Sequence, residues 1–287
     1  MLEASSNPGG LLWPMDWDGI PCECGFHSVG GLNPGEPLEI LFRKLGLMEL
    51  PWYKASPDDG FPFLRLNACT DFETDHIVKP FLSGVWRLEG GGKTLALALA
   101  SGLDIRYGAR VAAIENQIVT CLDGRVFEAD IVVSSLHPVA TLGLVKDHIR
   151  PVYGMRLSRM ENGPDFFIVH CLMEPGCVEW QSGAIFLDGN LMIHFGEPET
   201  GVLDLLCFES GNPSEMIARA ASRLPGLSVV RYCTATAPGY GIVKHSAQDF
   251  IAPRTPLPWL YLTGQNLGLH GILGTTVSAF NTCKYID

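Results

Sequence analysis

The residues best suited to chemistry lie in the C-terminal stretch LYLTGQNLGLHGILG, where a strand pattern passes through a glycine-rich turn into a helix pattern. At such a junction, free backbone N–H groups and the helix dipole point at one spot. Gly271 and Gly274 would let a flat or charged ligand approach the backbone closely. Gln265 and Asn266 add uncharged donors and acceptors. The stretch indicates a diphosphate or ribityl site, although a helix start packed closely on a strand explains it equally well.

A second candidate for ligand binding opens the chain. Glu3 ends a very short apolar start, and Gly9 and Gly10 follow it. An acid at a strand end before a glycine turn is typical of the group that binds ribose hydroxyls in dinucleotide folds. The G-x-G-x-x-G turn that precedes such an acid in those folds is not found in the sequence.

The run EGGGKT resembles a phosphate-binding P-loop. That loop requires a glycine five residues before the glycine of Gly-Lys-Thr, and Arg87 occupies this position. We therefore predict a glycine turn that enters a helix over residues 93–101.

Histidines and cysteines supply the remaining reactive side chains. His27, His137 and His270 lie in or beside the glycine-rich loops, but each is also typical of an ordinary packed or surface histidine. The pair Cys22 and Cys24 has no second pair at zinc-ligand spacing, so we expect no metal site. The nine cysteines are odd in number and irregularly spaced, which favours reduced thiols. The sequence shows no acid–base pair, and we assign no catalytic residue.

Composition excludes several classes of protein. Hydrophobic residues make up 47% and charged residues 18%, so the 287-residue chain is long and apolar enough to bury a sizeable core. The formal net charge of -11 argues against a nucleic-acid partner, and more weakly against anionic membrane surfaces. The start lacks a signal-peptide pattern, and the longest apolar stretch is too short to span a bilayer. We expect a cytoplasmic protein with at most peripheral membrane contact.

Helices and strands must position these residues. Apolar spacing predicts a helix over 37–45, a strand-rich antiparallel meander over 105–128, and a buried strand of a parallel sheet at ADIVVSS. We expect residues 1–36 to be mostly loop. Residues 145–250 read as strands around one helix that Asn212 caps with a capping-box Glu215, and Asp188-Gly189 marks a hairpin. A last strand and helix close the chain.

Six segments resemble a known family. LEASSNPGG, GFHSVGGL, WRLEGGGKTLALAL, GARVAAIE, LDGRVFEADIVVSSLHP and LYLTGQNLGLHGILG look like the FAD-dependent phytoene desaturase, carotenoid isomerase and retinol saturase group of amine-oxidase-like flavoproteins. They occur in the family's order and run nearly end to end. The resemblance implies an α/β fold: a discontinuous Rossmann-like FAD-binding domain at 1–144 and 251–287, with an inserted α+β substrate domain of mixed or antiparallel sheet at 145–250.

The resemblance also implies the residues that contact FAD. Around the adenosine and diphosphate it implies Glu3 on the ribose, Val111 at the adenine through its backbone, and Gly9, Gly10, Gly264, Gln265 and Asn266 along the diphosphate and ribityl chain. Around the flavin ring it implies Gly271, Ile272, Gly274 and the loop from Gly25 to Gly31, which includes His27 and Gly30.

This sequence departs from the family's pattern in two ways. Family members carry a strand, a G-x-G-x-x-G turn and a helix before the acid at Glu3, so we expect an N-terminally truncated chain. The stretches FETDHIVKPF and ATAPGYGIVKH look shortened. Because the missing turn would supply hydrogen bonds to the diphosphate, tight FAD binding by this chain alone is not expected.

The resulting hypothesis is an FAD-dependent desaturase, saturase or isomerase that acts on an apolar polyene or isoprenoid such as a carotenoid or retinol. Three alternatives stay open: a flavin-free protein that escorts an isoprenoid or a partner, a non-functional fragment, and an amine oxidase built on the same frame. The sequence assigns neither the direction of the reaction nor an oligomeric state.

Overall fold

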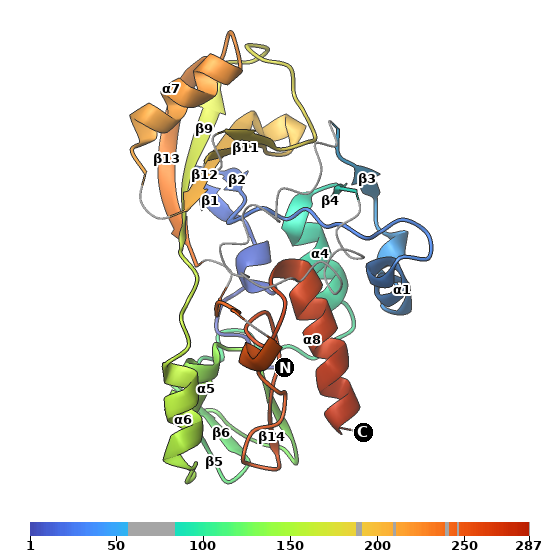
Figure 1. Cartoon of the computed structure of the whole chain (residues 1–287), viewed down its shortest axis with the longest axis vertical. Coiled ribbons are helices and arrows are strands. Elements are labelled where there is room, and N and C mark those ends of the chain that lie inside the picture. Colours follow the sequence, from blue (N-terminus) through green and yellow to red (C-terminus); the bar gives the residue numbers. More distant parts are fainter. Residues whose placement is uncertain (57–83, 188–190, 209–210, 239–240, 246, 287) are drawn as a thin grey trace.

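The structure, a computed structural model, describes residues 1–56, 84–187, 191–208, 211–238, 241–245 and 247–286. A five-stranded sheet lies with helix α7 at one end of the molecule, and shorter strands and helices lie at the other (Figure 1). Helix α8 runs beside the segments between them. The stretch FETDHIVKPF and the Asp188-Gly189 turn lie outside the described residues. The division at 144 and 250 stays a prediction.

The large sheet is antiparallel throughout, with strand order β10-β11-β12-β9-β13. Its strands are β9 (Phe166–Met173), β10 (Ile185–Leu187), β11 (Leu191–Phe195), β12 (Val202–Phe208) and β13 (Val229–Ala237). β11 and β12 are apolar except for His194 and Asp204, because both faces of the sheet are covered. The structure thus has the antiparallel form of the sheet expected in this part of the chain.

Helix α7 (Pro213–Arg223) covers one face of this sheet. Asn212 caps it by accepting hydrogen bonds from the backbone N–H groups of Ser214 and Glu215, as predicted. Met216 and Ala220 lie in one buried cluster with the side chains of β11 and β12. The opposite face carries a second cluster, which includes Ile168 and Leu206.

A short parallel pair stands apart from that sheet. β8 (Val132–Ser134) pairs in parallel with β14 (Leu260–Leu262), and a glycine-rich turn leads from β14 into α8 (Gly271–Ile286). The parallel pairing of β8 was predicted. The prediction that β8 is buried was wrong, because Val133 is 45% exposed. In the part of the chain that the structure describes, β8 has β14 as its one strand partner. α8 is the longest described helix, and none of the described helices is long and apolar enough to cross a bilayer.

The remaining elements surround α4 (Gly91–Ala100), the helix predicted over residues 93–101, which begins inside the glycine run. They are α1 (Pro37–Lys44), β3 (Trp52–Lys54), β4 (Trp86–Leu88), the meander β5 (Val111–Glu115), β6 (Ile118–Cys121) and β7 (Val126–Glu128), and the helices α5 (Pro138–Leu144) and α6 (Pro151–Ser158). Residues 105–107, expected to form a strand, contribute an isolated parallel bridge from Arg106 to Leu2.

The expectation that residues 1–36 are mostly loop overlooked one hairpin. β1 (Met15–Trp17) and β2 (Ile20–Cys22) pair in antiparallel fashion around Asp18 and Gly19. Both turn residues have positive φ, which a two-residue hairpin turn requires. The Asp-Gly pair was the signal for this hairpin.

Candidate active site

A cavity of about 1000 Å³ lies beside α8. Its walls come from α8, the turn before it, the loop of residues 24–27, and parts of α1 and α4. Most of the lining is apolar and includes Phe26, Phe42, Leu95 and Phe280. Ligand sites are commonly large, mostly apolar cavities with a few polar groups, so this cavity is the candidate site.

The cavity brings together eight of the side chains or glycines that the resemblance implied. These are Gly9, Gly25, His27, Gly264, Gln265, Asn266, Gly271 and Ile272. Six others are not among its described lining residues: Glu3, Gly10, Gly30, Gly31, Val111 and Gly274.

Three of the residues outside the wall have local structural contacts. The Glu3 carboxylate accepts hydrogen bonds from the backbone N–H and the hydroxyl of Ser5, which lie 2.8 and 2.9 Å from its Oε1. Val111 pairs with Cys121 across β5 and β6. A Cβ on Gly274 would lie 1.7 Å from the carbonyl oxygen of Leu269. Gly274 therefore serves the close packing of α8 on the preceding turn.

The first turn of α8 faces the cavity. Gly271 and Ile272 line it together with Thr275, Thr276 and Ala279, which recur at helical spacing along one side. The free N–H groups and the dipole at this end of the helix favour a negative or strongly polar group of a ligand. Gly271 has a φ of +65°, a conformation that favours glycine.

Asn266 supplies a polar group that has no partner. It is 7% exposed and lines the cavity, and its Oδ1 makes no hydrogen bond within the described residues. Its backbone carbonyl accepts a hydrogen bond of 2.9 Å from the Nζ of buried Lys244. Burial lowers the pKa of Lys244 to about 8, with Asp249 opposing the shift and Arg156 adding to it. A buried acceptor without a donor in a cavity wall points to a ligand that carries one.

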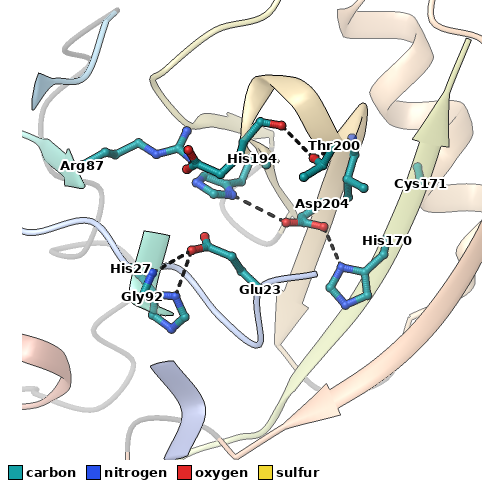
Figure 2. Close-up of polar contacts among 12 residues, drawn as sticks. Glu23, His27, Arg87, Gly92, His170, Cys171, His194, Thr200 and Asp204 are labelled. Atoms are coloured by element: carbon teal, nitrogen blue, oxygen red, sulfur yellow. Dashed lines mark hydrogen bonds and ion pairs between the residues drawn. The ribbon is translucent and has the colours of Figure 1, made fainter. Parts of the chain in front are cut away.

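A buried polar cluster, which sequence reasoning missed, lies between the sheet and α4 (Figure 2). His194, Asp204 and His170 are direct cross-strand partners on β11, β12 and β9. The Asp204 carboxylate lies 2.6 Å from His170 Nδ1 and 3.7 Å from His194 Nδ1. Burial would raise the Asp204 pKa, but these two histidines outweigh it and lower the pKa. A single polar residue inside each apolar strand pattern was the available signal.

Glu23 and His27 join this cluster to the cavity. His27 Nδ1 lies 3.3 Å from Glu23 Oε1, and the same oxygen accepts a hydrogen bond of 3.2 Å from the backbone N–H of Gly92. Nearby, Arg87 lies 3.7 Å from Glu197, whose carboxylate also accepts from the N–H of Gly90. Figure 2 shows Glu23, His27 and Arg87 around one region beside His194.

The cavity wall fits a flavin ring. Apolar side chains can pack on its faces, the Asn266 Oδ1 can accept from a ring N–H, and the N-terminus of α8 can face its polar edge. The described lining residues include neither Lys nor Arg, so a diphosphate would depend on backbone N–H groups and helix dipoles there.

Comparison with protein families gives one match. Residues 50–154 match the model of the family described as flavin containing amine oxidoreductase. The match covers less than half of the chain. FAD is the cofactor that this family implies. A search of curated proteins found no match.

Solved structures resemble the chain along nearly its whole length. An oxidoreductase from Methanosarcina mazei has a TM-score of 0.69 at 15% identity, over 99% of this chain and 93% of that one. A protein from Pyrococcus furiosus has a TM-score of 0.67 at 14% identity, over 99% and 90%. A putrescine oxidase variant redesigned in its cofactor binding has a TM-score of 0.65 at 14% identity, over 100% and 92%. At these identities the likeness establishes the mixed α/β fold alone.

Proposed function

We propose that this chain is an FAD-dependent oxidoreductase of the desaturase, saturase or isomerase type whose substrate is an apolar polyene or isoprenoid such as a carotenoid or retinol. The observation that carries the proposal is the wall of the 1000 Å³ cavity. Its side chains are mostly aliphatic and aromatic, and Asp165 is the one carboxylate among the described lining residues. Such a wall favours a ligand whose surface is largely hydrocarbon.

In this proposal, the cofactor supplies the transfer of electrons and hydride, and the chain's residues bind and orient. Asn266 accepts a hydrogen bond from a polar edge of the ligand, since its Oδ1 is otherwise unpaired. The backbone N–H groups in the first turn of α8 donate hydrogen bonds to a negatively charged or polar group of the ligand. The aromatic and leucine side chains exclude water from the substrate.

A titration of the purified chain with FAD tests the proposal, followed by flavin absorbance and thermal melting. One FAD bound per chain with a raised Tm would support the proposal, because a ligand that binds the folded state stabilises it. Thr275→Trp should fill the cavity and weaken FAD binding at least about tenfold, which corresponds to roughly 1.4 kcal/mol. Asn281→Trp is the matched control, because Asn281 is exposed on the same helix and outside the described cavity lining.

The alternatives give different outcomes. Saturable binding of a fluorescent prenyl ligand without any effect of FAD would favour the flavin-free escort protein. An aggregated chain that binds neither would favour a non-functional fragment. Oxidation of a primary amine such as putrescine, with no turnover of retinol, would favour the amine oxidase.

A further inference from the structure

Glu23 and His27 form a pair at the cavity wall that the proposed binding role leaves unexplained. Both side chains are mostly buried, with 14% and 11% of their surfaces exposed. The Glu23 carboxylate is held by the backbone N–H of Gly92, 3.2 Å from Oε1, while His27 Nδ1 lies 3.3 Å from that oxygen. His27 itself lines the cavity.

The glycine run EGGGK makes room for this pair. A Cβ on Gly91 would lie 2.2 Å from Glu23 Oε1. A Cβ on Gly92 would lie 2.8 Å from His27 Nδ1 and 2.6 Å from the carbonyl oxygen of Leu12. Real Cβ atoms do not approach other atoms so closely, so side chains at these two positions would displace the pair. The run EGGGK therefore does not bind phosphate as a P-loop does. Its glycines leave the space that the Glu23 and His27 side chains occupy.

The charge of the Glu23 carboxylate determines which ring nitrogen of His27 is protonated and donates a hydrogen bond to it. Burial would raise the pKa of Glu23, but the charge and hydrogen bond of His27, together with His194 and Arg87, bring it down to about 2. An ionised carboxylate is an acceptor without a proton, so the Nδ1 of His27 must donate. The Nε2 then remains for other partners, and it makes no hydrogen bond within the described residues.

We propose that His27 transfers a proton to and from the substrate through its Nε2, and that Glu23 is the residue that positions it. The inference rests on the proposed function. In the saturating direction, a carbon–carbon double bond gains a hydride, with both electrons, from the reduced cofactor. His27 gives a proton to the neighbouring carbon, becomes neutral, and regains a proton from water. Desaturation reverses these transfers, and His27 then accepts the proton.

The first test needs neither cofactor nor turnover. In ¹⁵N-histidine NMR spectra of the full chain, assigned with the His27→Gln variant, neutral His27 should carry its hydrogen on Nδ1. Diethyl pyrocarbonate should then modify His27 at Nε2, and all-trans-retinol should protect it, while buried His170 stays unmodified. Hydrogen on Nε2, or a His27 that the reagent modifies equally with and without retinol, would overturn the proposal.

The second test measures turnover of all-trans-retinol with reduced FAD in deuterated buffer. His27→Gln should lower kcat at least about 100-fold, the range of general acid–base catalysis, and leave KM within about threefold. Glu23→Gln should lower kcat about tenfold, and Glu23→Asp should restore part of the rate. The matched control is Glu89→Gln, because Glu89 is exposed and lies outside the described cavity lining.

The outcomes separate this inference from the proposed function. A wild-type chain that binds no FAD overturns the proposed function, and the NMR and modification results then decide the orientation of His27. A wild-type chain that converts retinol while His27→Gln keeps its kcat overturns the role of His27 and leaves the proposed function standing.

Discussion

The five-stranded sheet and the parallel β8–β14 pair bury their strands to different extents. All five residues of β11 and six of the seven in β12 are buried. In β8, by contrast, Val133 is 45% exposed, although Leu260 and Leu262 of its partner β14 are fully buried. The central strands of the large sheet are therefore buried on both faces, whereas one face of β8 is open.

The two regions also differ in where their buried polar groups lie. In the sheet, the Asp204 carboxylate lies between His170 and His194, while His170 Nε2 and His194 Nδ1 make no hydrogen bond within the described residues. The Oδ1 of Asn266 also has no partner there, but Asn266 lines the cavity. An unpaired buried acceptor costs about 1–3 kcal/mol, which a ligand in the cavity can recover. The Asn266 Oδ1 is therefore an unpaired group that a cavity ligand can reach.

The largest expected effect contrasts the two cores directly. Phe195→Ala in β11 should lower the free energy of unfolding by about 3–5 kcal/mol, because Phe195 is fully buried and the change leaves a cavity. Val133→Ala in β8 should change it by less than about 0.5 kcal/mol. Urea unfolding measures both. Equal losses would contradict the contrast.

A second change addresses the buried lysine behind the cavity turn. The Lys244 pKa is about 8 in the folded chain against 10.5 for the ordinary group, so the unfolded chain binds more protons between these pH values. Wild-type stability should therefore rise from pH 8 to pH 10.5. Lys244→Met should remove this rise and add about 2 kcal/mol at pH 7, after the lost hydrogen bond to Asn266. Melting curves across this pH range, compared with those of Lys146→Met, would show it; an unchanged slope would count against the shift.

The third change tests the packing of α8. Gly274→Ala should destabilise the chain by about 1–3 kcal/mol and weaken FAD binding, because its Cβ would meet the Leu269 backbone. Gly143→Ala in α5 is the matched control, since its Cβ would meet nothing within 4 Å. Thermal melting and FAD titration measure the two effects. A tolerated Gly274→Ala would mean that the turn before α8 can move.

The smallest expected effect concerns the helix that covers the sheet. Asn212→Ala removes the acceptor for the N–H groups of Ser214 and Glu215 and should cost about 1 kcal/mol. Ser214→Ala should change the free energy of unfolding by a few tenths of a kcal/mol, because Ser214 is exposed. Both variants should bind FAD as the wild-type chain does. The stability of the sheet can then be changed without changing ligand binding in the cavity.

Local patterns predicted most elements of both regions. The apolar face of residues 37–45 predicted α1, and the Asn212 cap predicted the start of α7. The Asp18-Gly19 signal for a hairpin was present but overlooked. These features follow from interactions between residues close in the chain, so the sequence pattern carries them directly.

Eight of the residues that the resemblance implied as FAD contacts line the cavity, and their role in binding stays a prediction. The pattern around residues 264–272 led to the wall that the structure shows, since a strand, a turn and a helix are neighbours in sequence. Gly274 was assigned to the same wall, but it packs on Leu269. Sequence pattern alone does not distinguish a glycine needed for a ligand from one needed for packing, because both are selected for a missing side chain.

The sequence by itself determined most local elements and the glycine-rich turn before the last helix, and it left the large sheet as mixed or antiparallel. The tertiary structure decided which distant side chains meet. Asp204 and His170 are 34 residues apart, and Gly92 lies 69 residues from the carboxylate of Glu23 that it holds. Their contacts arise when strands pair and the loop of residues 23–27 packs on α4. The histidines beside Asp204 and Glu23 then lower the pKa of each carboxyl against the effect of burial.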